Sequence, residues 1–222
     1  MERSAWLKEK RRMAEMRMDT MFAATYDDHW GGYINATHAA FVQQLLDLCP
    51  RGCAIFDAAC GTGKYWSMIL ASGRSVTGID QSQEMLKKAQ AKHPDVAVEK
   101  IGLQEMRYRQ AFDGLICMDA MEFVFPEDWP LVVSNFQRAL QPGGHCYFTV
   151  EIIDENERQE AFAQGKAEGL PLVEGEYTIG GGYHYYPPIA RARQWTMDAD
   201  FTILEEAEGD GYYHFLTRKQ SM

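Results

Sequence analysis

Two acidic residues and two glycines stand at a spacing that suits a bound nucleoside. Asp57 and Asp80 each end a short apolar run, and Gly61 and Gly63 follow the first of them in the stretch "FDAACGTGKYW" (56–66). A strand, a glycine-rich turn and a helix start leave backbone N–H groups bare for a ligand, and an acid about twenty residues later can accept hydrogen bonds from both ribose hydroxyls. Single acids also cap turns and helices without binding anything. The pair of acids around the glycines favours a nucleotide-like ligand.

The spacing separates three classes of such ligand. A P-loop requires a glycine five residues before the Gly-Lys pair and Ser or Thr after it, but Ala58 and Tyr65 occupy those places. A dinucleotide turn requires a third small residue three positions after the second glycine, where Trp66 stands. The remaining interpretation is a nucleoside without a pyrophosphate.

The elements that must position these residues alternate along the chain. Strands are expected at 53–58, 75–79, 96–101, 112–118 and 145–152, and helices at 36–48, 64–71, 83–92, 130–140 and 189–198, with "QPGG" (141–144) as a turn. Beyond residue 154 come a polar helix, a Gly- and Tyr-rich loop and two strands that Gly209, Asp210 and Gly211 join as a hairpin. The pattern predicts an α/β fold, a parallel sheet with helices on both sides and an antiparallel edge.

Composition narrows the class of protein. The chain has 222 residues and a formal net charge of −10, so one domain is expected and a broad nucleic-acid surface is disfavoured. No apolar run approaches the roughly 20 residues of a membrane span, and the first residues lack the apolar core of a signal peptide. The five cysteines form no C-x-x-C pair, which predicts buried thiols in a cytoplasmic protein and no metal site. The basic first twenty residues predict a helix packed on the domain, with a membrane or partner face as the alternative.

Four motifs in order resemble those of class I S-adenosylmethionine-dependent methyltransferases of the small-molecule type: "FDAACGTG", "GIDQSQEML", "FDGLICMDAMEFV" and "LQPGGHCYFTVE". The resemblance covers most of the chain from about residue 53. It implies a doubly wound, Rossmann-like, mostly parallel seven-stranded sheet whose last strand is antiparallel. It also implies S-adenosyl-L-methionine as the cofactor, with S-adenosyl-L-homocysteine as its product. On this basis residues 1–50 are expected to form a helical lid segment and 51–222 the methyltransferase domain, with a lid insertion at about 154–188.

The resemblance also implies roles for single residues. The cofactor-binding set is Asp57, Ala59, Gly61, Gly63, Asp80, Gln81, Met85, Leu103, Gln104 and Asp119. Ala59 stands where the family usually has its first glycine. Gly102 stands where the family often has an acid that bonds the adenine amino group, so that contact must come from Gln104 or elsewhere.

The substrate is expected at the carboxyl ends of the strands, under two aromatic segments, "TYDDHWGGYINATH" and "GGGYHYYPP". The residues predicted to touch the acceptor are Trp30, Tyr33, Glu122, Tyr183 and Tyr185, and those predicted to act in catalysis are Tyr26, His38, Asp119 and His184. Tyr26 resembles a tyrosine that small-molecule N-methyltransferases place near the transferring methyl, and Asp119 and Glu122 could hold a cationic amine. A general base is optional, because the cofactor carries its own leaving group.

The leading hypothesis is an enzyme of the EC 2.1.1 type that methylates a nitrogen or oxygen of a small-molecule metabolite. A nucleic-acid-base or protein methyltransferase is one alternative, although "DAME" (119–122) replaces the Asn/Asp-Pro-Pro-Tyr signature of amino-group base methylases. A non-catalytic S-adenosylmethionine-binding regulatory module is another. The expected partner is a small-molecule methyl acceptor, with no nucleic acid and no membrane, and either a monomer or a homodimer is possible.

Overall fold

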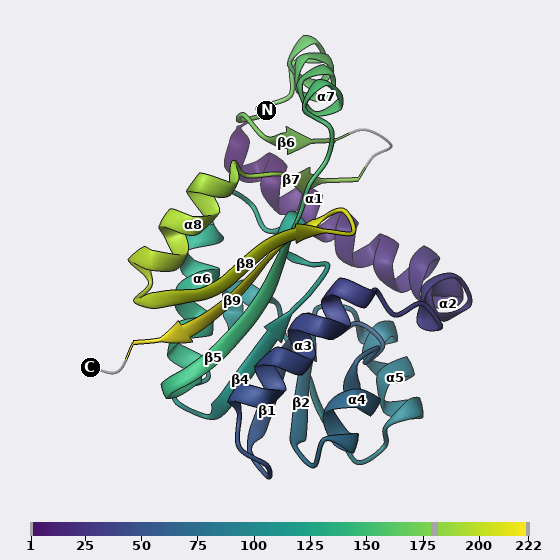
Figure 1. Cartoon of the computed structure of the whole chain (residues 1–222). Helices are drawn as coiled ribbons and strands as arrows, with labels where there is room; N and C mark the ends of the chain where they lie inside the picture. The colour runs from purple at the N-terminus through teal and green to yellow at the C-terminus, as the bar shows by residue number, and fades with distance from the viewer. Residues whose placement is uncertain (1, 179–181, 221–222) are drawn as a thin grey trace.

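The computed structural model describes residues 2–178 and 182–220, and a seven-stranded sheet forms its centre (Figure 1). The sheet order is β3-β2-β1-β4-β5-β9-β8. Its strands are β1 (Ala54–Ala58), β2 (Ser75–Asp80), β3 (Ala97–Lys100), β4 (Phe112–Cys117), β5 (Leu140–Glu151), β8 (Phe201–Gly209) and β9 (Tyr212–Lys219). The first five run parallel, and β9 lies antiparallel between β5 and β8. The predicted seven-stranded, mostly parallel sheet with an antiparallel last strand is confirmed.

Helices cover both faces of this sheet. On one face lie α3 (Ala36–Leu48), α4 (Trp66–Ala71) and α5 (Gln83–Lys92), and on the other α6 (Trp129–Ala139) and α8 (Ile189–Asp198). Side-chain caps fix where two of them begin, since Asn35 accepts a hydrogen bond from the His38 amide and Ser82 accepts one from the Met85 amide. These caps explain why the expected ranges for α3 and α5 coincide with the observed ones.

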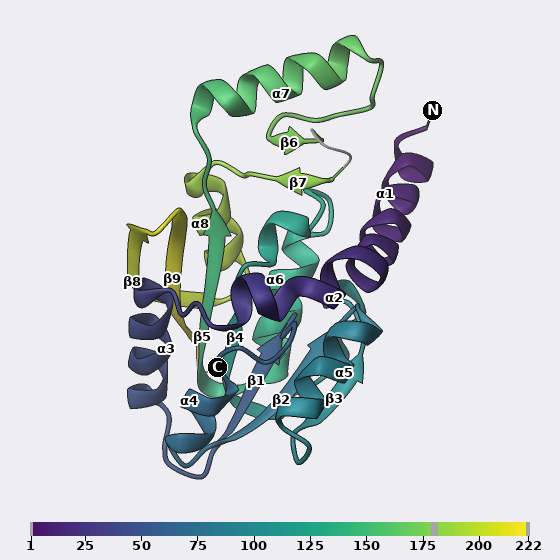
Figure 2. The ribbon, with the colours of Figure 1, turned by 90° about the vertical axis from the view of Figure 1, so that its right-hand side faces the viewer.

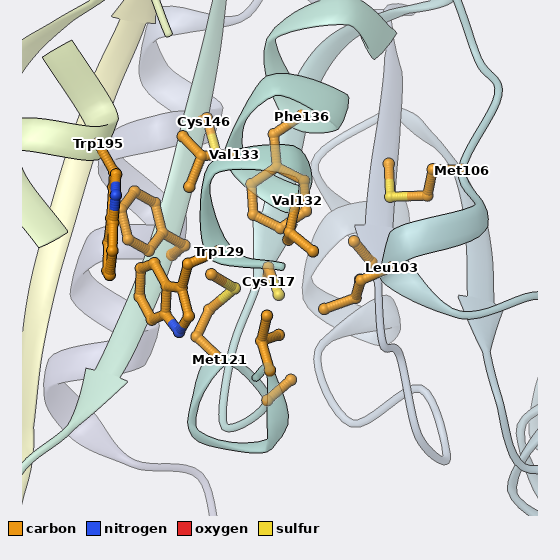
Figure 3. Packing of buried hydrophobic residues seen from close by; sticks show 14 of the residues in the cluster. Leu103, Met106, Cys117, Met121, Trp129, Val132, Val133, Phe136, Cys146 and Trp195 are labelled. Carbon is orange, nitrogen blue, oxygen red and sulfur yellow. The ribbon is translucent and has the colours of Figure 1, made fainter. Parts of the chain in front are cut away.

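Side chains of the parallel strands alternate between two apolar layers. In β1, Ile55 packs among α3 and α4, and its neighbour Phe56 packs on the α6 side. Figure 3 shows the α6 layer, where the indoles of Trp129 and Trp195 are stacked with ring centroids 5.2 Å apart. Burial on both faces accounts for the continuous apolar runs of the central strands.

The stretch "QPGG" is not a turn, which corrects the expectation from sequence. Residues 141–144 lie inside β5, which pairs with β4 through Leu140 opposite Phe112 and then through His145 opposite Gly114. The intervening residues bulge, and Gly143 adopts a positive φ of 76°. A Cβ on Gly144 would lie 2.9 Å from the Asp113 carbonyl oxygen, so the bulge packs directly on β4. Pro and Gly are typical of turns and of bulges alike, and only the pairing partner separates the two.

An almost continuous helical segment, residues 3–31, precedes α3 and is called the cover segment below. It consists of α1 (Arg3–Arg17), two π-helical turns (Met18–Phe22 and Asp27–Gly31) and the short α2 (Ala23–Tyr26) between them. Figures 1 and 2 show α1, the helix α7 (Glu155–Ala167) and the ribbon of β6 (Glu176–Tyr177) and β7 (His184–Tyr185) at the upper end of the sheet. The carboxyl ends of the parallel strands therefore lie under this upper layer.

The cover segment is tied to the β6–β7 ribbon by a buried ion pair. The guanidinium of Arg3 donates two hydrogen bonds to the fully buried carboxylate of Glu176, at 2.8 and 2.9 Å. The Tyr183 hydroxyl donates to the same carboxylate at 2.7 Å, and the Tyr183 ring lies edge-on to the buried Trp6 with centroids 5.9 Å apart. The N-terminal helix thus packs on the domain. Among the described residues no helix has both the length and the apolar character needed to cross a bilayer.

The packing around Gly78 yields a stability prediction. A Cβ on Gly78 would lie 2.4 Å from Trp66 Cζ2 and 2.8 Å from Cys60 Sγ. Gly78→Ala should therefore overpack this layer and lower the free energy of unfolding by about 1–3 kcal/mol, measured by urea denaturation. Gly32→Ala is the matched control, because nothing lies within 4 Å of its Cβ position and its φ is −89°. Equal stability of the two variants would show that Trp66 does not fill this space.

Candidate active site

The predicted ligand residues gather where the strand order reverses. β1 lies between β2 and β4, so the chain leaves β1 and β4 in opposite directions and opens a crevice at their carboxyl ends. Asp57 and Asp80 lie at the ends of β1 and β2, and Asp119 follows β4. In Figure 2 the helices α1 and α2 of the cover segment lie beside these strand ends. The fold therefore brings the two acids, the glycine turn and Asp119 to one place.

The glycine turn has the conformation that its sequence predicts. Gly61 and Gly63 have φ values of 54° and 72°, a region that glycine enters without strain. A Cβ on Gly61 would meet nothing within 4 Å, so the backbone there faces open space that a ligand can use. A Cβ on Gly63 would lie 2.7 Å from the Trp66 ring, so this glycine serves packing. Ala59 also adopts a positive φ, 62°, which strains this residue where the family usually has glycine.

Asp57 stabilises the glycine turn through a hydrogen bond with Trp66. Its buried carboxylate accepts a hydrogen bond from the Trp66 indole at 2.7 Å. Burial raises the pKa of Asp57 to about 7; the Trp66 hydrogen bond acts in the lowering direction, and the nearby Asp80 adds to the rise. The Trp66 ring lies against Gly78 of β2 and fills the space that the glycine leaves. A dinucleotide-binding turn needs a small residue at the position of Trp66. Asp57 therefore anchors α4 to β1 and reaches a ligand only through the turn that it supports.

Asp80 links the turn to the loop after β2. One of its carboxylate oxygens accepts a hydrogen bond from the Gly61 amide at 2.9 Å, and the other accepts one from the Ser82 amide at 2.8 Å. Burial raises the pKa of Asp80, whereas these hydrogen bonds act in the opposite direction. A carboxylate oxygen has two lone pairs, so each can accept a further hydrogen bond from a ribose hydroxyl. The position of Asp80 fits the predicted ribose acid.

The predicted adenine residues divide between a cavity and the core. Gln81 and Gln104 line a cavity of about 30 Å³, and Lys10, Arg11 and Phe123 also border it. Leu103 packs in the apolar layer under α6, and Met85 is buried at the first turn of α5. The cavity therefore supports Gln81 and Gln104 as ligand contacts, and it leaves Leu103 and Met85 with packing roles.

Glu105 fills the place of the acid that is absent at Gly102. A Cβ on Gly102 would lie 2.5 Å from Glu105 Oε2 and 2.8 Å from Arg11 Nη2. Glu105 ends the short helix Leu103–Glu105 and forms an ion pair with Arg11 of the cover segment. The sequence interpretation missed this residue, although an acid three positions after Gly102 in a tight helical turn was a usable signal.

The cover segment closes over the ligand loops. Asp27 accepts hydrogen bonds from the Thr62 hydroxyl at 2.7 Å and from Lys92 at 3.1 Å. Asp19 accepts hydrogen bonds from the Ser82 hydroxyl and from the Glu84 amide. The cover segment is thus hydrogen-bonded both to the glycine turn and to the loop after β2.

Asp119 is held at the end of β4 by three groups. It adopts a positive φ of 52°, and its amide donates to the Thr149 hydroxyl at 3.0 Å. The Nε2 of His38 donates to Asp119 Oδ1 at 2.7 Å, and the Tyr212 hydroxyl donates to the same carboxylate. His38 is fully buried, and the Asn35 cap fixes the start of its helix. His38 and Asp119, two of the residues predicted to act in catalysis, are brought together, with His38 positioned to orient the carboxylate.

Two further carboxylates adjoin Asp119. Glu122 lies in the short helix Met121–Phe123, and Glu151 ends β5. Burial raises the pKa of Glu122 well above its ordinary value, and the charges of Glu151 and Asp119 raise it further. Burial also raises the pKa of Glu151, which accepts a hydrogen bond from the Tyr186 hydroxyl. Glu151 was missed from sequence, although an acid at the end of a parallel strand is the same signal that identified Asp57 and Asp80.

Tyr26 connects the two halves of the site. Burial raises its pKa to about 12, and the charges of Asp119, Asp80, Asp27 and Glu122 contribute in that order. The hydroxyl is therefore protonated at neutral pH and is available as a hydrogen-bond donor. The charges of Asp80 and of Asp119 both act on this hydroxyl, and its role near the reacting atoms stays a prediction.

The other predicted aromatic residues divide between the surface and the β6–β7 ribbon, and Tyr183 also borders the cavity of Gln81 and Gln104. Trp30 and Tyr33 are each 55% exposed, which does not fit an enclosed substrate wall. Tyr183 and Tyr185 are buried, but Tyr183 bonds Glu176 and Tyr185 packs against Gly175, so both hold the ribbon together. His184 lies 4.9 Å from Phe123 between ring centroids, and burial lowers its pKa. The loop "GGGYHYYPP" extends into residues 179–181, which are outside the described residues.

Known proteins resemble this chain in sequence. The profile of a family described as a methyltransferase domain matches residues 55–144. A ubiquinone biosynthesis O-methyltransferase of Paracidovorax citrulli (strain AAC00-1) is 27% identical over 200 residues, which cover 85% of this chain and 78% of that protein. A dTDP-3-amino-3,4,6-trideoxy-alpha-D-glucopyranose N,N-dimethyltransferase of Streptomyces venezuelae is 23% identical over 184 residues, covering 80% of this chain and 73% of that protein.

A solved structure has the same fold. It is the 1,6-didemethyltoxoflavin-N1-methyltransferase of Burkholderia thailandensis with bound 1,6-didemethyltoxoflavin and S-adenosylhomocysteine, superposed with a TM-score of 0.70 at 19% identity. The superposition covers 95% of this chain and 90% of that one, so the likeness extends beyond the central sheet.

The buried Asp57 carboxylate predicts a pH dependence of stability. Its pKa of about 7 in the folded protein exceeds the ~3.9 of an unfolded aspartate, so folding favours the protonated form. The stabilisation is fully present below about pH 4 and is lost as the pH rises through about 7. Asp57→Asn keeps an acceptor for Trp66 but binds no proton. Between pH 5 and 8 the free energy of unfolding of the variant should therefore rise relative to wild type, by roughly 2–4 kcal/mol.

Urea denaturation of the ligand-free protein across this pH range measures the difference. Asp95→Asn, at an exposed position after α5, is the matched control and should follow wild type. Parallel profiles for wild type and Asp57→Asn would mean that Asp57 is not buried as described.

Proposed function

The chain belongs to the class I S-adenosylmethionine-dependent methyltransferases, and we propose that it methylates a nitrogen or an oxygen of a small-molecule acceptor. The observation that carries this proposal is the position of Tyr26, which is coupled both to Asp80 of the cofactor half and to Asp119 and Glu122 beyond it. A cofactor lying along the glycine turn would point its reacting end toward these groups. One relative is named as an O-methyltransferase of ubiquinone biosynthesis and another as an N,N-dimethyltransferase of a dTDP-linked amino sugar, which is consistent with the proposal.

The residues of this chain fit the cofactor of the family. Gly61 offers bare backbone over open space, Asp80 offers carboxylate lone pairs to a ribose, and Gln81, Gln104 and Glu105 surround the place for an adenine. When bound, S-adenosylmethionine supplies a methyl carbon on a positively charged sulfur, which an in-line nucleophile can take. The work left to the protein is alignment and exclusion of water, and orientation alone can contribute roughly 7–11 kcal/mol.

Tyr26, His38 and Asp119 are proposed to carry out that alignment. The protonated Tyr26 hydroxyl can donate a hydrogen bond to the acceptor, and Asp119 can receive one from it. His38 holds the Asp119 carboxylate in place from the buried side. No proton needs to leave before transfer if the acceptor attacks as a neutral amine.

Residues 1–50 are proposed to act as a lid on the domain formed by residues 51–222, with the insertion at about 154–188 as its second part. In the closed form the hydrogen bonds from Thr62 and Lys92 to Asp27 join the first part to the domain, and the ion pair of Arg3 with Glu176 joins the two parts to each other. The lid is proposed to open before the cofactor binds, because Asp27 is hydrogen-bonded to the glycine turn in the closed form.

A nucleic-acid or protein acceptor is the alternative, and the net charge of −10 disfavours the first. Incubation with tritium-labelled S-adenosylmethionine and separate pools of amines, phenols, carboxylic acids, transfer RNA and protein extract tests the proposal. Label should appear in a small-molecule pool. Label in RNA or protein alone would overturn it.

The ribose assignment predicts a loss of cofactor affinity. Asp80→Asn removes the charge that strengthens hydrogen bonds to two hydroxyls, so S-adenosylhomocysteine should bind at least about ten-fold more weakly. Isothermal titration calorimetry measures the affinity, and circular dichroism checks the fold. Asp95→Asn is the control and should bind as wild type does. Unchanged affinity in a folded Asp80→Asn protein would remove Asp80 from the cofactor site.

Tyr26 should act on the chemical step more than on cofactor binding. Tyr26→Phe keeps the ring and removes one hydrogen bond in a charged setting, worth about 1.5–3 kcal/mol, so kcat should fall roughly ten-fold or more. The affinity for S-adenosylhomocysteine should stay within about two-fold of wild type. Tyr177→Phe, which removes an exposed hydroxyl bonded to Glu157, is the matched control. Unchanged kcat in Tyr26→Phe would assign Tyr26 to packing alone.

A further inference from the structure

Three carboxylates meet on the acceptor side of the proposed site. Asp119 follows β4, Glu122 lies three residues later, and Glu151 ends the neighbouring β5. Their charges act on one another, since Glu151 and Asp119 both disfavour ionisation of Glu122, and Asp119 disfavours ionisation of Glu151. Three acids in one place are costly unless something positive joins them.

Glu122 carries an independent sign of a missing partner. The residue is 3% exposed, and its Oε2 has no hydrogen-bond partner among the described residues. The backbone amide of Glu122 donates a hydrogen bond to its own carboxylate. A buried oxygen without a donor costs about 1–3 kcal/mol, more if it is charged, so a donor from outside the chain would be bound strongly.

The surroundings select the kind of donor. Three tyrosines face the carboxylates: Tyr186 donates to Glu151, Tyr212 donates to Asp119, and Tyr26 has its pKa raised by Asp119 and Glu122. Tyrosine rings beside carboxylates favour an ammonium group, whereas an acceptor with a carboxylate or phosphate here would be repelled. Lys64 is a cation near Asp119, and burial lowers the pKa of its ammonium group.

Building on the function proposed above, we propose that the acceptor is a small amine whose nitrogen binds as an ammonium between Glu122, Glu151 and Asp119. Binding of the ammonium displaces the proton of Glu122 to solvent, and the resulting carboxylate then takes one proton from the ammonium, which leaves a neutral amine. The nitrogen lone pair forms the bond to the methyl carbon as the carbon–sulfur bond breaks and its electron pair stays on sulfur. The methylated nitrogen is again positive and faces Glu151 and Asp119.

The proposal predicts that the site binds a permanent cation more tightly than a neutral molecule of the same shape. The probes are choline and 3,3-dimethylbutan-1-ol, added to protein saturated with S-adenosylhomocysteine so that the cofactor site is filled. Choline should bind at least about ten-fold more tightly than the alcohol. It should also displace a proton from Glu122, because burial raises the pKa of that carboxyl, and calorimetry in phosphate and in Tris detects the release as a difference in heat.

Variants assign the preference to the cluster. Glu122→Gln should abolish the proton release and the preference for choline, and Glu151→Gln, at a half-buried position, should reduce that preference about ten-fold. Glu160→Gln, at an exposed position of α7, is the matched control and should behave as wild type. Both probes bound equally, neither probe bound, or unchanged preference in a folded Glu122→Gln or Glu151→Gln protein would overturn the proposal.

The tritium assay keeps this proposal apart from the function on which it rests. Label in the amine pool, with loss in Glu122→Gln, supports both. Label confined to phenols or carboxylic acids overturns the amine site and leaves small-molecule methyl transfer standing. Label in no small-molecule pool overturns the proposed function, and the choline experiment then still decides whether the cluster binds a cation.

Discussion

The hydrogen bond from the Trp66 indole to the buried Asp57 carboxylate determines the shape of the ligand end of the sheet. It joins the last part of β1 to the first residue of α4, across the turn that contains Gly61 and Gly63. The Trp66 indole fills the space beside Gly63 and Gly78, and a side chain at either glycine would collide with it. With the turn held this way, the Gly61 amide can reach Asp80, and the two loops of the cofactor half become one unit.

The same end of the sheet collects negative charge, and the fold compensates for it in different ways. Asp57 and Asp80 are supported by an indole and by backbone amides, and Asp119 is supported by His38, Tyr212 and Thr149. One oxygen of the Glu122 carboxylate, Oε2, lacks such support among the described residues. A buried carboxylate oxygen without a donor marks where a positively charged molecule would complete the arrangement.

Much of this arrangement was accessible from the sequence, and the limits have physical causes. The helices 36–48 and 83–92 were predicted to the residue because Asn35 and Ser82 cap them locally. Asp80 and Gly61 were identified because strand, turn and acid follow at fixed spacing along the chain. The bulge at 141–144 was read as a turn because its pairing with β4 is a long-range property.

The acceptor side was the harder part for the same reason. The antiparallel register of β5 and β9 places Glu151 opposite Tyr212. The short helix Leu103–Glu105 places the Glu105 carboxylate beside Gly102. Neither arrangement follows from spacing along the chain. Trp30 and Tyr33 suggested an enclosed wall by composition, yet solvent reaches both. Composition predicts that aromatic residues are present in a segment, whereas the direction in which they point depends on the helix that carries them.

The polar contacts of the cover segment have a consequence for turnover. Several of its ties to the domain are exposed ion pairs, between Lys100 and Glu15, Arg11 and Glu105, and Lys92 and Asp27. Dissolved salt screens such pairs, with a Debye length of about 8 Å at physiological ionic strength. The Trp6 contacts and the pair of Arg3 with Glu176 are more shielded and would persist. If the cover segment opens in every catalytic cycle, as proposed, ionic strength would determine how long S-adenosyl-L-homocysteine stays bound. The hinge of this motion would lie on the side of the β6–β7 ribbon.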